Sequence, residues 1–105
     1  MSKYAFAYHG GPGMASTEEE MAEVMAAWGA WFGELGGAIV DGGAPVAQTS
    51  TVASDGSVTN GGGANPITGY SIISADSLYA AVALAKGCPG LAGGGSVEVA
   101  ELIDM

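Results

Sequence analysis

The sequence is poor in the side chains that recognise anions and carry out covalent chemistry. It has no arginine, two lysines, one histidine and one cysteine among 105 residues, and its net charge is −9. Phosphates require a basic surface, so we expect neither nucleic acid nor an anionic membrane as a partner. A single cysteine allows no disulfide within the chain, and no secretory leader pattern is present at the N-terminus. We therefore expect a cytoplasmic protein.

Charged residues are also scarce, at 12% of the chain, whereas 49% of residues are hydrophobic. A chain of this length makes one domain, residues 1–105, and buries only about 60–70% of its unfolded surface. Few charges remain to cover the outside. We therefore expect part of the apolar surface to be covered by a second copy, in a homodimer.

The apolar periodicity predicts two helices among short strands. Thr17 followed by Glu20 is a capping box that starts the first helix, and Asp76 is the expected N-cap of the second. An Asp-Gly turn at Asp55 predicts a thin hairpin between residues 46–53 and 58–59. The remaining strands are expected at residues 4–8, 38–41, 69–74 and 96–103.

The first helix carries one broad apolar stripe, which is most simply a core-facing surface; the alternative is a hydrophobic ligand site. Gly29 and Gly33 lie on a smooth flank of the same helix, where each costs about 1 kcal/mol relative to alanine. We expect another element, most simply a helix, to approach that flank closely. The stripe consists of Met21, Val24, Met25, Trp28, Trp31, Phe32 and Leu35.

The order of elements is strand, helix, strand, hairpin, strand, helix, strand. Two interleaved crossovers in one antiparallel sheet predict an α+β fold, a ferredoxin-like split βαβ sandwich with an inserted β-hairpin. Both helices should then cover one face of the sheet. The other face is bare in a single chain, and packing it against a second copy is the natural way to bury it.

The chain resembles the YCII-related domain family. The resemblance rests on this element order, on Thr68-Gly69-Tyr70, on Cys88-Pro89 and on the closing run Gly95–Val99. It implies a dimeric α+β barrel and no settled activity, although a histidine–aspartate pair in a pocket is the usual suggestion for the family. Trp28 stands where many relatives carry a helix histidine, and residues 62–66 replace an Asp-Gly-Pro-Phe motif. The family's catalytic residues therefore do not carry over.

His9 is the main candidate for chemistry, at the end of the first strand. In a split βαβ sheet it should share one rim with Asp41, about 10 Å away. Histidine exchanges protons near neutral pH, so His9 is a candidate general acid or base, with Asp41 or Glu98 orienting it. Asn65, Tyr70 and Glu98 enter from the same rim, which predicts a pocket lined by these residues for a small neutral or weakly polar molecule.

Two alternatives to catalysis remain open. His9 bonded to a loop carbonyl would be purely structural, and the protein would be a non-catalytic accessory or sensor module. We expect no metal and no cofactor, since one histidine and one cysteine make no ligand set. The loop at Gly10–Gly13 lacks the lysine of a phosphate loop and is followed by Glu18, Glu19 and Glu20. Cys88 is expected to be a small buried side chain that only fills space in the core.

Overall fold

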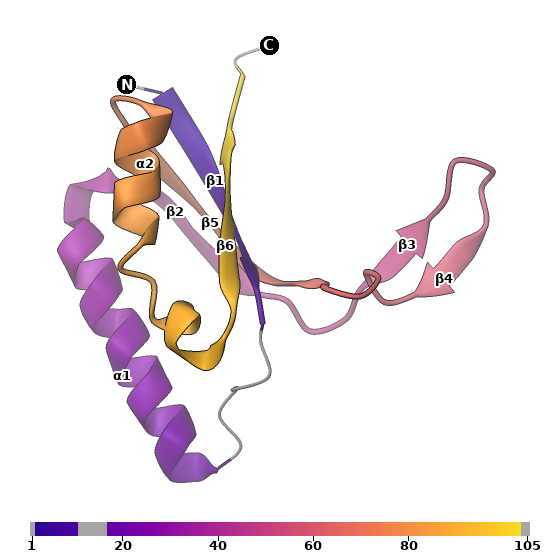
Figure 1. Ribbon diagram of the computed structural model, residues 1–105, viewed down its shortest axis with the longest axis horizontal. Helices are drawn as coiled ribbons and strands as arrows, with labels where there is room; N and C mark the ends of the chain where they lie inside the picture. The colour runs from indigo at the N-terminus through magenta and orange to yellow at the C-terminus, as the bar shows by residue number, and fades with distance from the viewer. Residues whose placement is uncertain (1, 11–16, 104–105) are drawn as a thin grey trace.

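Four antiparallel strands form the main sheet of the computed structural model, which describes residues 2–10 and 17–103 (Figure 1). The strand order is β2-β5-β1-β6, so β1 and β5 are central, and β3 pairs only with β4 in a separate two-stranded sheet. This confirms the expected α+β class with two helices. The elements are β1 (Ser2–His9), α1 (Glu18–Leu35), the 3₁₀ helix η1 (Gly36–Ala38), β2 (Ile39–Pro45), β3 (Ser50–Val52), β4 (Val58–Asn60), β5 (Ile67–Ala75), α2 (Leu78–Ala85), the 3₁₀ helix η2 (Pro89–Gly93) and β6 (Ser96–Glu101).

Several boundaries differ from the sequence-based expectation. β2 continues to Pro45, four residues beyond the expected end. The N-cap of α2 is Ser77 rather than Asp76, because the Ser77 hydroxyl accepts a hydrogen bond from the Ala80 amide at 3.1 Å. The loop expected before β6 contains η2, and β6 ends at Glu101. The glycine-rich run considered as a phosphate loop lies mostly outside the described residues.

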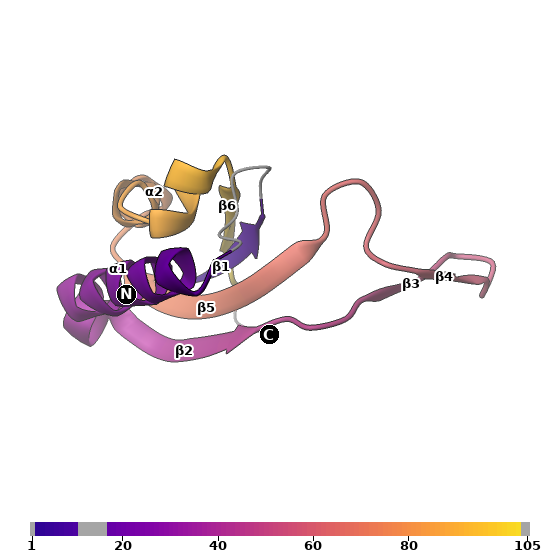
Figure 2. The same ribbon diagram turned by 90° about the horizontal axis from the view of Figure 1, so that it is seen from below.

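Alternation along β1 separates the two faces of the sheet. Tyr4, Phe6 and Tyr8 are buried under the helices, whereas Ala5 and Ala7 point the other way. Both helices lie on the same side of the sheet, as expected, and Figure 2 shows them together above β1 and β5. The buried apolar residues of this single core are Tyr4, Phe6, Tyr8, Trp31, Leu35, Ile73, Ala75, Ala81, Ala85 and Cys88.

The opposite side of the sheet is an open face, which we define by Ala5, Ala7 and Ile72. By register, Ala5 lies beside Ile72 of β5 and Ala100 of β6, so these side chains are neighbours on one surface. No described helix covers this surface (Figure 2). Ala7 lies beside Tyr70 of β5 and Glu98 of β6, so the small apolar side chains of the open face are flanked by an aromatic ring and a carboxylate.

The β3–β4 hairpin projects away from the main sheet (Figures 1 and 2). Its turn is the expected Asp-Gly turn. The Asp55 carboxylate accepts a hydrogen bond from the Ser57 amide at 2.8 Å, and Gly56 has a φ of +89°. A left-handed φ at this position explains the glycine. The hairpin is exposed throughout, so it contributes nothing to the core.

The predicted start of α1 is confirmed, but only part of its apolar stripe is buried in the core. The Thr17 hydroxyl accepts from the Glu20 amide at 3.1 Å, as a capping residue should. Trp31 and Leu35 are buried, whereas Met21 is exposed and Met25 is 75% exposed. The expectation that the whole stripe packs in the core is therefore wrong for the first turns of α1. These turns lie over a hollow beside β2 instead of over packed side chains.

Among residues 2–10 and 17–103, nothing packs closely against the smooth flank of α1. A Cβ added at Gly29 or Gly33 would meet nothing within 4 Å, so the expected close approach of another helix is wrong for the described part of the single chain. We therefore predict that Gly33→Ala raises the free energy of unfolding by about 0.5–1 kcal/mol, since alanine restricts the unfolded chain and favours the helix.

Urea unfolding measures this effect, and Gly36→Ala is the matched control. Gly36 also has open space around its Cα, but its φ is +50°, so alanine there should lower stability. A Gly33→Ala protein that is less stable than the unchanged chain would contradict the prediction and indicate that a second copy occupies the flank.

Candidate functional site

His9 lies at the end of β1 and bridges two neighbouring segments. Its Nδ1 is 2.9 Å from the backbone carbonyl oxygen of Asn65, and its Nε2 is 3.5 Å from Oε1 of Glu98. A carbonyl oxygen only accepts hydrogen bonds, so Nδ1 carries a proton and Nε2 is the atom that can exchange one with its surroundings. The structure thus brings together three of the predicted residues: His9, Asn65 and Glu98.

Asp41 is not part of this group. It pairs with Ile72 of β5, which pairs in turn with Ala5, four residues before His9 on β1. At about 3.3 Å per residue and 4.8 Å per strand, Asp41 is roughly 13 Å back along the sheet and 10 Å across it from His9. The expected His9–Asp41 pair is therefore wrong, because β2 does not end at Asp41.

The Asp41 carboxylate has a local role instead. It accepts a hydrogen bond from the Gly43 amide at 2.8 Å, across an irregularity in the pairing of β2 with β5 between Asp41 and Ala44. Gly43 has a φ of +72°, and a Cβ there would lie 1.7 Å from the carbonyl oxygen of Tyr70. The Gly42-Gly43 pair thus forms a bulge that lets β2 continue, where the sequence suggested a stop.

A cavity of about 550 Å³ lies between α1 and the strands β2 and β5. It is on the helix-covered side of the sheet, and its wall is mainly apolar. Tyr70, the remaining predicted site residue, lines it, but His9, Asn65 and Glu98 do not. The lining residues are Tyr8, Val24, Met25, Trp28, Gly29, Phe32, Gly42, Gly43, Ala44, Pro45, Thr68, Gly69, Tyr70 and Ser71.

Aromatic rings form one wall of the cavity. Trp28 packs edge to face against Tyr8, with ring centroids 4.8 Å apart and an interplanar angle of 83°, and its ring is 5.9 Å from that of Phe32. Val24 and Met25 continue this wall on exposed turns of α1. Sequence reasoning counted these residues mainly as core, and the available signal was the alternative of a hydrophobic ligand site.

Polar groups on the cavity wall form a short chain. The Tyr8 hydroxyl donates to Ser71 Oγ at 2.9 Å, and Ser71 Oγ donates to the Gly42 carbonyl oxygen at 2.9 Å. Burial raises the pKa of Tyr8 to about 12, although the bond to Ser71 opposes the shift. Tyr8 is therefore a neutral phenol at physiological pH, and no lining residue carries a charged side chain.

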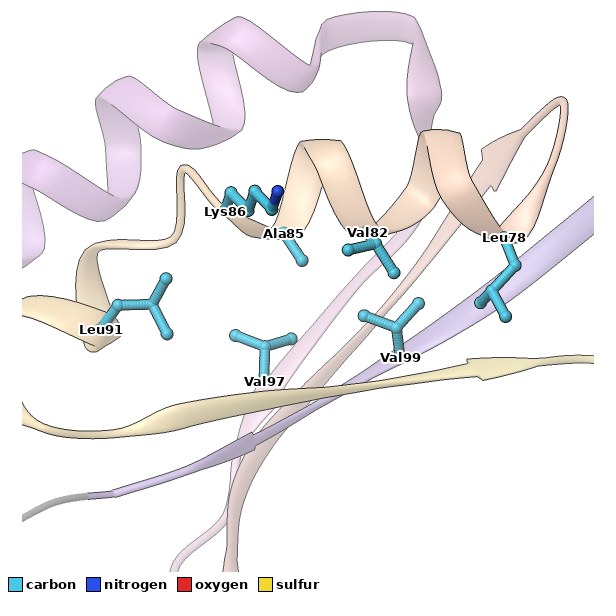
Figure 3. Close-up of a pocket in the computed structure, with 7 residues that line it drawn as sticks. All are labelled: Leu78, Val82, Ala85, Lys86, Leu91, Val97 and Val99. Carbon is cyan, nitrogen blue, oxygen red and sulfur yellow. The ribbon is translucent and has the colours of Figure 1, made fainter.

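A second hollow, of about 370 Å³, separates α2 from the edge strand β6. Figure 3 shows Val97 and Val99 pointing from β6 toward Val82 and Ala85 of α2, with Leu91 closing one end. Lys86 is its one charged lining residue. Without an acid or a nucleophile, this groove offers contact surface rather than chemistry.

Metal and thiol chemistry find little support in the described part of the chain. Residues 2–10 and 17–103 contain no group of three histidine, cysteine, aspartate or glutamate side chains that could hold a metal ion. Cys88 is buried, as expected, and burial raises the pKa of its thiol, which disfavours the reactive thiolate. Across the same residues, no helix is long and apolar enough to cross a membrane.

The fold and cavity define a small α+β protein with an apolar hollow under one helix. No protein-family model matches the chain, and no curated protein matches it.

Proposed function

We propose that the protein binds a small neutral or weakly polar molecule in the cavity between α1 and the strands β2 and β5. The observation that carries the proposal is a hollow of about 550 Å³ whose wall is mainly aromatic and aliphatic and bears no charged side chain. Ligand sites are typically 300–1,000 Å³, mainly apolar, with a few fixed polar groups. The exposed Met25 and Val24 beside this hollow gain apolar contacts when a ligand fills it.

We also propose that the protein is a cytoplasmic, YCII-related homodimer with a ferredoxin-like fold. The strand order β2-β5-β1-β6, with a helix in each of two crossovers, supports the fold assignment. The open face supports the dimer, because two copies packed through Ala5, Ala7 and Ile72 would bury apolar surface that one copy leaves to water. Such packing gives a dimeric α+β barrel.

A second candidate function is proton transfer centred on His9. It is supported by the Asn65 carbonyl, which fixes the ring, and by Glu98, which faces Nε2. His9 is on the open-face side of β1 and lines neither cavity, so a substrate site there would need the second copy. His9→Ala should abolish turnover if this function is correct, and should leave ligand binding unchanged if the protein is a non-catalytic accessory or sensor module.

Binding in the cavity can be tested by filling it from α1. We predict that Gly29→Leu weakens binding of a neutral apolar dye such as Nile red by about tenfold or more, because the new side chain occupies the space of the ligand. Fluorescence titration measures the affinity. Gly33→Leu is the matched control, one helical turn away and outside the cavity, and should bind like the unchanged protein. Equal binding by the two variants would place the dye elsewhere.

The dimer has a direct test in solution. Light scattering at micromolar concentration should give twice the chain mass of 10.2 kDa. Ala5→Glu places an unpaired charge at the centre of the open face and should yield monomers with unchanged circular dichroism. Ala27→Glu, on an exposed position of α1, should remain dimeric. A monomeric mass for the unchanged protein would contradict the proposed interface.

A further inference from the structure

The polar chain on the cavity wall can accept a hydrogen bond from a ligand but has no proton left to donate. We infer that the cavity selects flat, neutral aromatic molecules that carry a hydrogen-bond donor, the class of phenols and indoles, over isosteric molecules that offer only an acceptor. This inference rests on the proposed function of the cavity. It adds a ligand class, the side chain that contacts the ligand donor, Tyr8, and the side chain that fixes the direction of the Tyr8 proton, Ser71.

The proton positions follow from the identity of the last acceptor. The Gly42 carbonyl oxygen has no proton, so the bond of 2.9 Å between it and Ser71 Oγ uses the single hydroxyl proton of Ser71. Ser71 Oγ must then accept in its other bond of 2.9 Å, and the Tyr8 hydroxyl must donate. Only lone pairs remain on the two oxygens, since Ser71 is 1% exposed and has no freedom to reorient toward water.

Two further donors on the wall are committed in the same way. The Thr68 hydroxyl donates to the Tyr8 carbonyl oxygen at 3.1 Å, and the Gly43 amide donates to the Asp41 carboxylate at 2.8 Å. Tyr70 pairs with Ala7, so its side chain lies on the open face, on the other side of the sheet from Tyr8 and Ser71. A ligand acceptor placed against Tyr8 and Ser71 would lose its bonds to water without replacement, whereas a ligand donor would find a lone pair.

The shape and charge of the cavity further restrict the class of molecules that it can bind. The edge-to-face packing of Trp28 on Tyr8, with Phe32 beside it, presents rings against which a flat aromatic molecule can pack. No lining side chain is cationic, and the whole chain carries a net charge of −9. Carboxylates and phosphates are therefore disfavoured, in keeping with a neutral ligand.

The test uses two molecules of similar shape that differ in one proton. 2-Naphthol carries a hydroxyl donor, and 2-methoxynaphthalene keeps the oxygen acceptor but lacks the donor. Isothermal titration calorimetry should show about tenfold tighter binding of 2-naphthol, even though the ether is the more hydrophobic molecule. Equal or tighter binding of the ether would overturn the inference and leave the proposed function intact. Binding of neither molecule would count against the proposed function itself.

Two variants assign the preference to the hydroxyl chain. Ser71→Ala frees the Tyr8 proton for donation, so the ether should gain affinity and the preference should fall below about threefold. Tyr8→Phe removes the acceptor from the ring and should reduce the preference by losing affinity for 2-naphthol. Ser74→Ala, on the same strand but outside the cavity, is the matched control and should retain the full preference. A tenfold preference that survives both Ser71→Ala and Tyr8→Phe would overturn the inference.

Discussion

Gly43→Ala should destabilise the protein by about 3–5 kcal/mol, as the sum of backbone strain and a steric clash. The φ of Gly43 is +72°, which L side chains rarely adopt, and the added Cβ would lie 1.7 Å from the Tyr70 carbonyl oxygen. The neighbouring atom is backbone in a central strand, so it cannot move aside as a flexible side chain would. Relief requires β2 to shift away from β5.

Gly42→Ala is the matched control for this prediction. Gly42 is the adjacent residue and also lines the cavity, but a Cβ there would meet nothing within 4 Å. We expect it to change stability by less than about 1 kcal/mol. Urea unfolding followed by circular dichroism compares the two variants. If Gly43→Ala is as stable as Gly42→Ala, the bulge in β2 is not as tightly packed against Tyr70 as described.

Trp31→Ala should cost about 3–5 kcal/mol, which is a large fraction of the stability of a small domain. Trp31 is buried and stacks on Phe6, with centroids 6.1 Å apart and an interplanar angle of 12°. Its Nε1 donates to the Leu84 carbonyl oxygen at 3.3 Å, so the same side chain joins α1 to α2. Removing it leaves a void at the centre of the core and separates the two helices.

Thermal unfolding tests the Trp31 prediction, with two comparison variants. Trp31→Phe retains most of the ring packing and loses the Nε1 bond, so it should lose only about 1–2 kcal/mol. Tyr79→Ala removes a comparable ring that is 85% exposed on α2, and should be within about 0.5 kcal/mol of the unchanged protein. If Trp31→Ala and Tyr79→Ala unfolded at the same temperature, that result would contradict the central position of Trp31 in the core.

Local signals in the sequence predicted the element order well, because each depends on residues close together in the chain. Thr17 was expected to cap α1 and does so through the Glu20 amide. The Asp55 turn appeared where expected. The N-cap of α2 was misplaced by one residue, since Asp76 and Ser77 are both good capping residues.

The candidate site was less predictable, because it depends on strand register. Glu98 and Asn65 were expected near His9 and lie there, on strands or loops that start at the same edge. Asp41 was expected there too, on the assumption that Gly42-Gly43 ended the strand. The pair instead forms a bulge, so Asp41 lies partway along the edge strand β2. A glycine pair is compatible with both outcomes.

The sequence by itself determined the α+β class, the helix start at Thr17, and the lack of basic groups for binding anions. These properties follow from composition and from periodicities of two or 3.6 residues. Only the tertiary structure decided that β2 runs past Asp41 and that half of the α1 stripe lines a cavity. It also decided that the Tyr8 hydroxyl donates to Ser71 and that Ser71 donates to the Gly42 carbonyl oxygen. These depend on contacts between residues far apart in the chain, which no local pattern encodes.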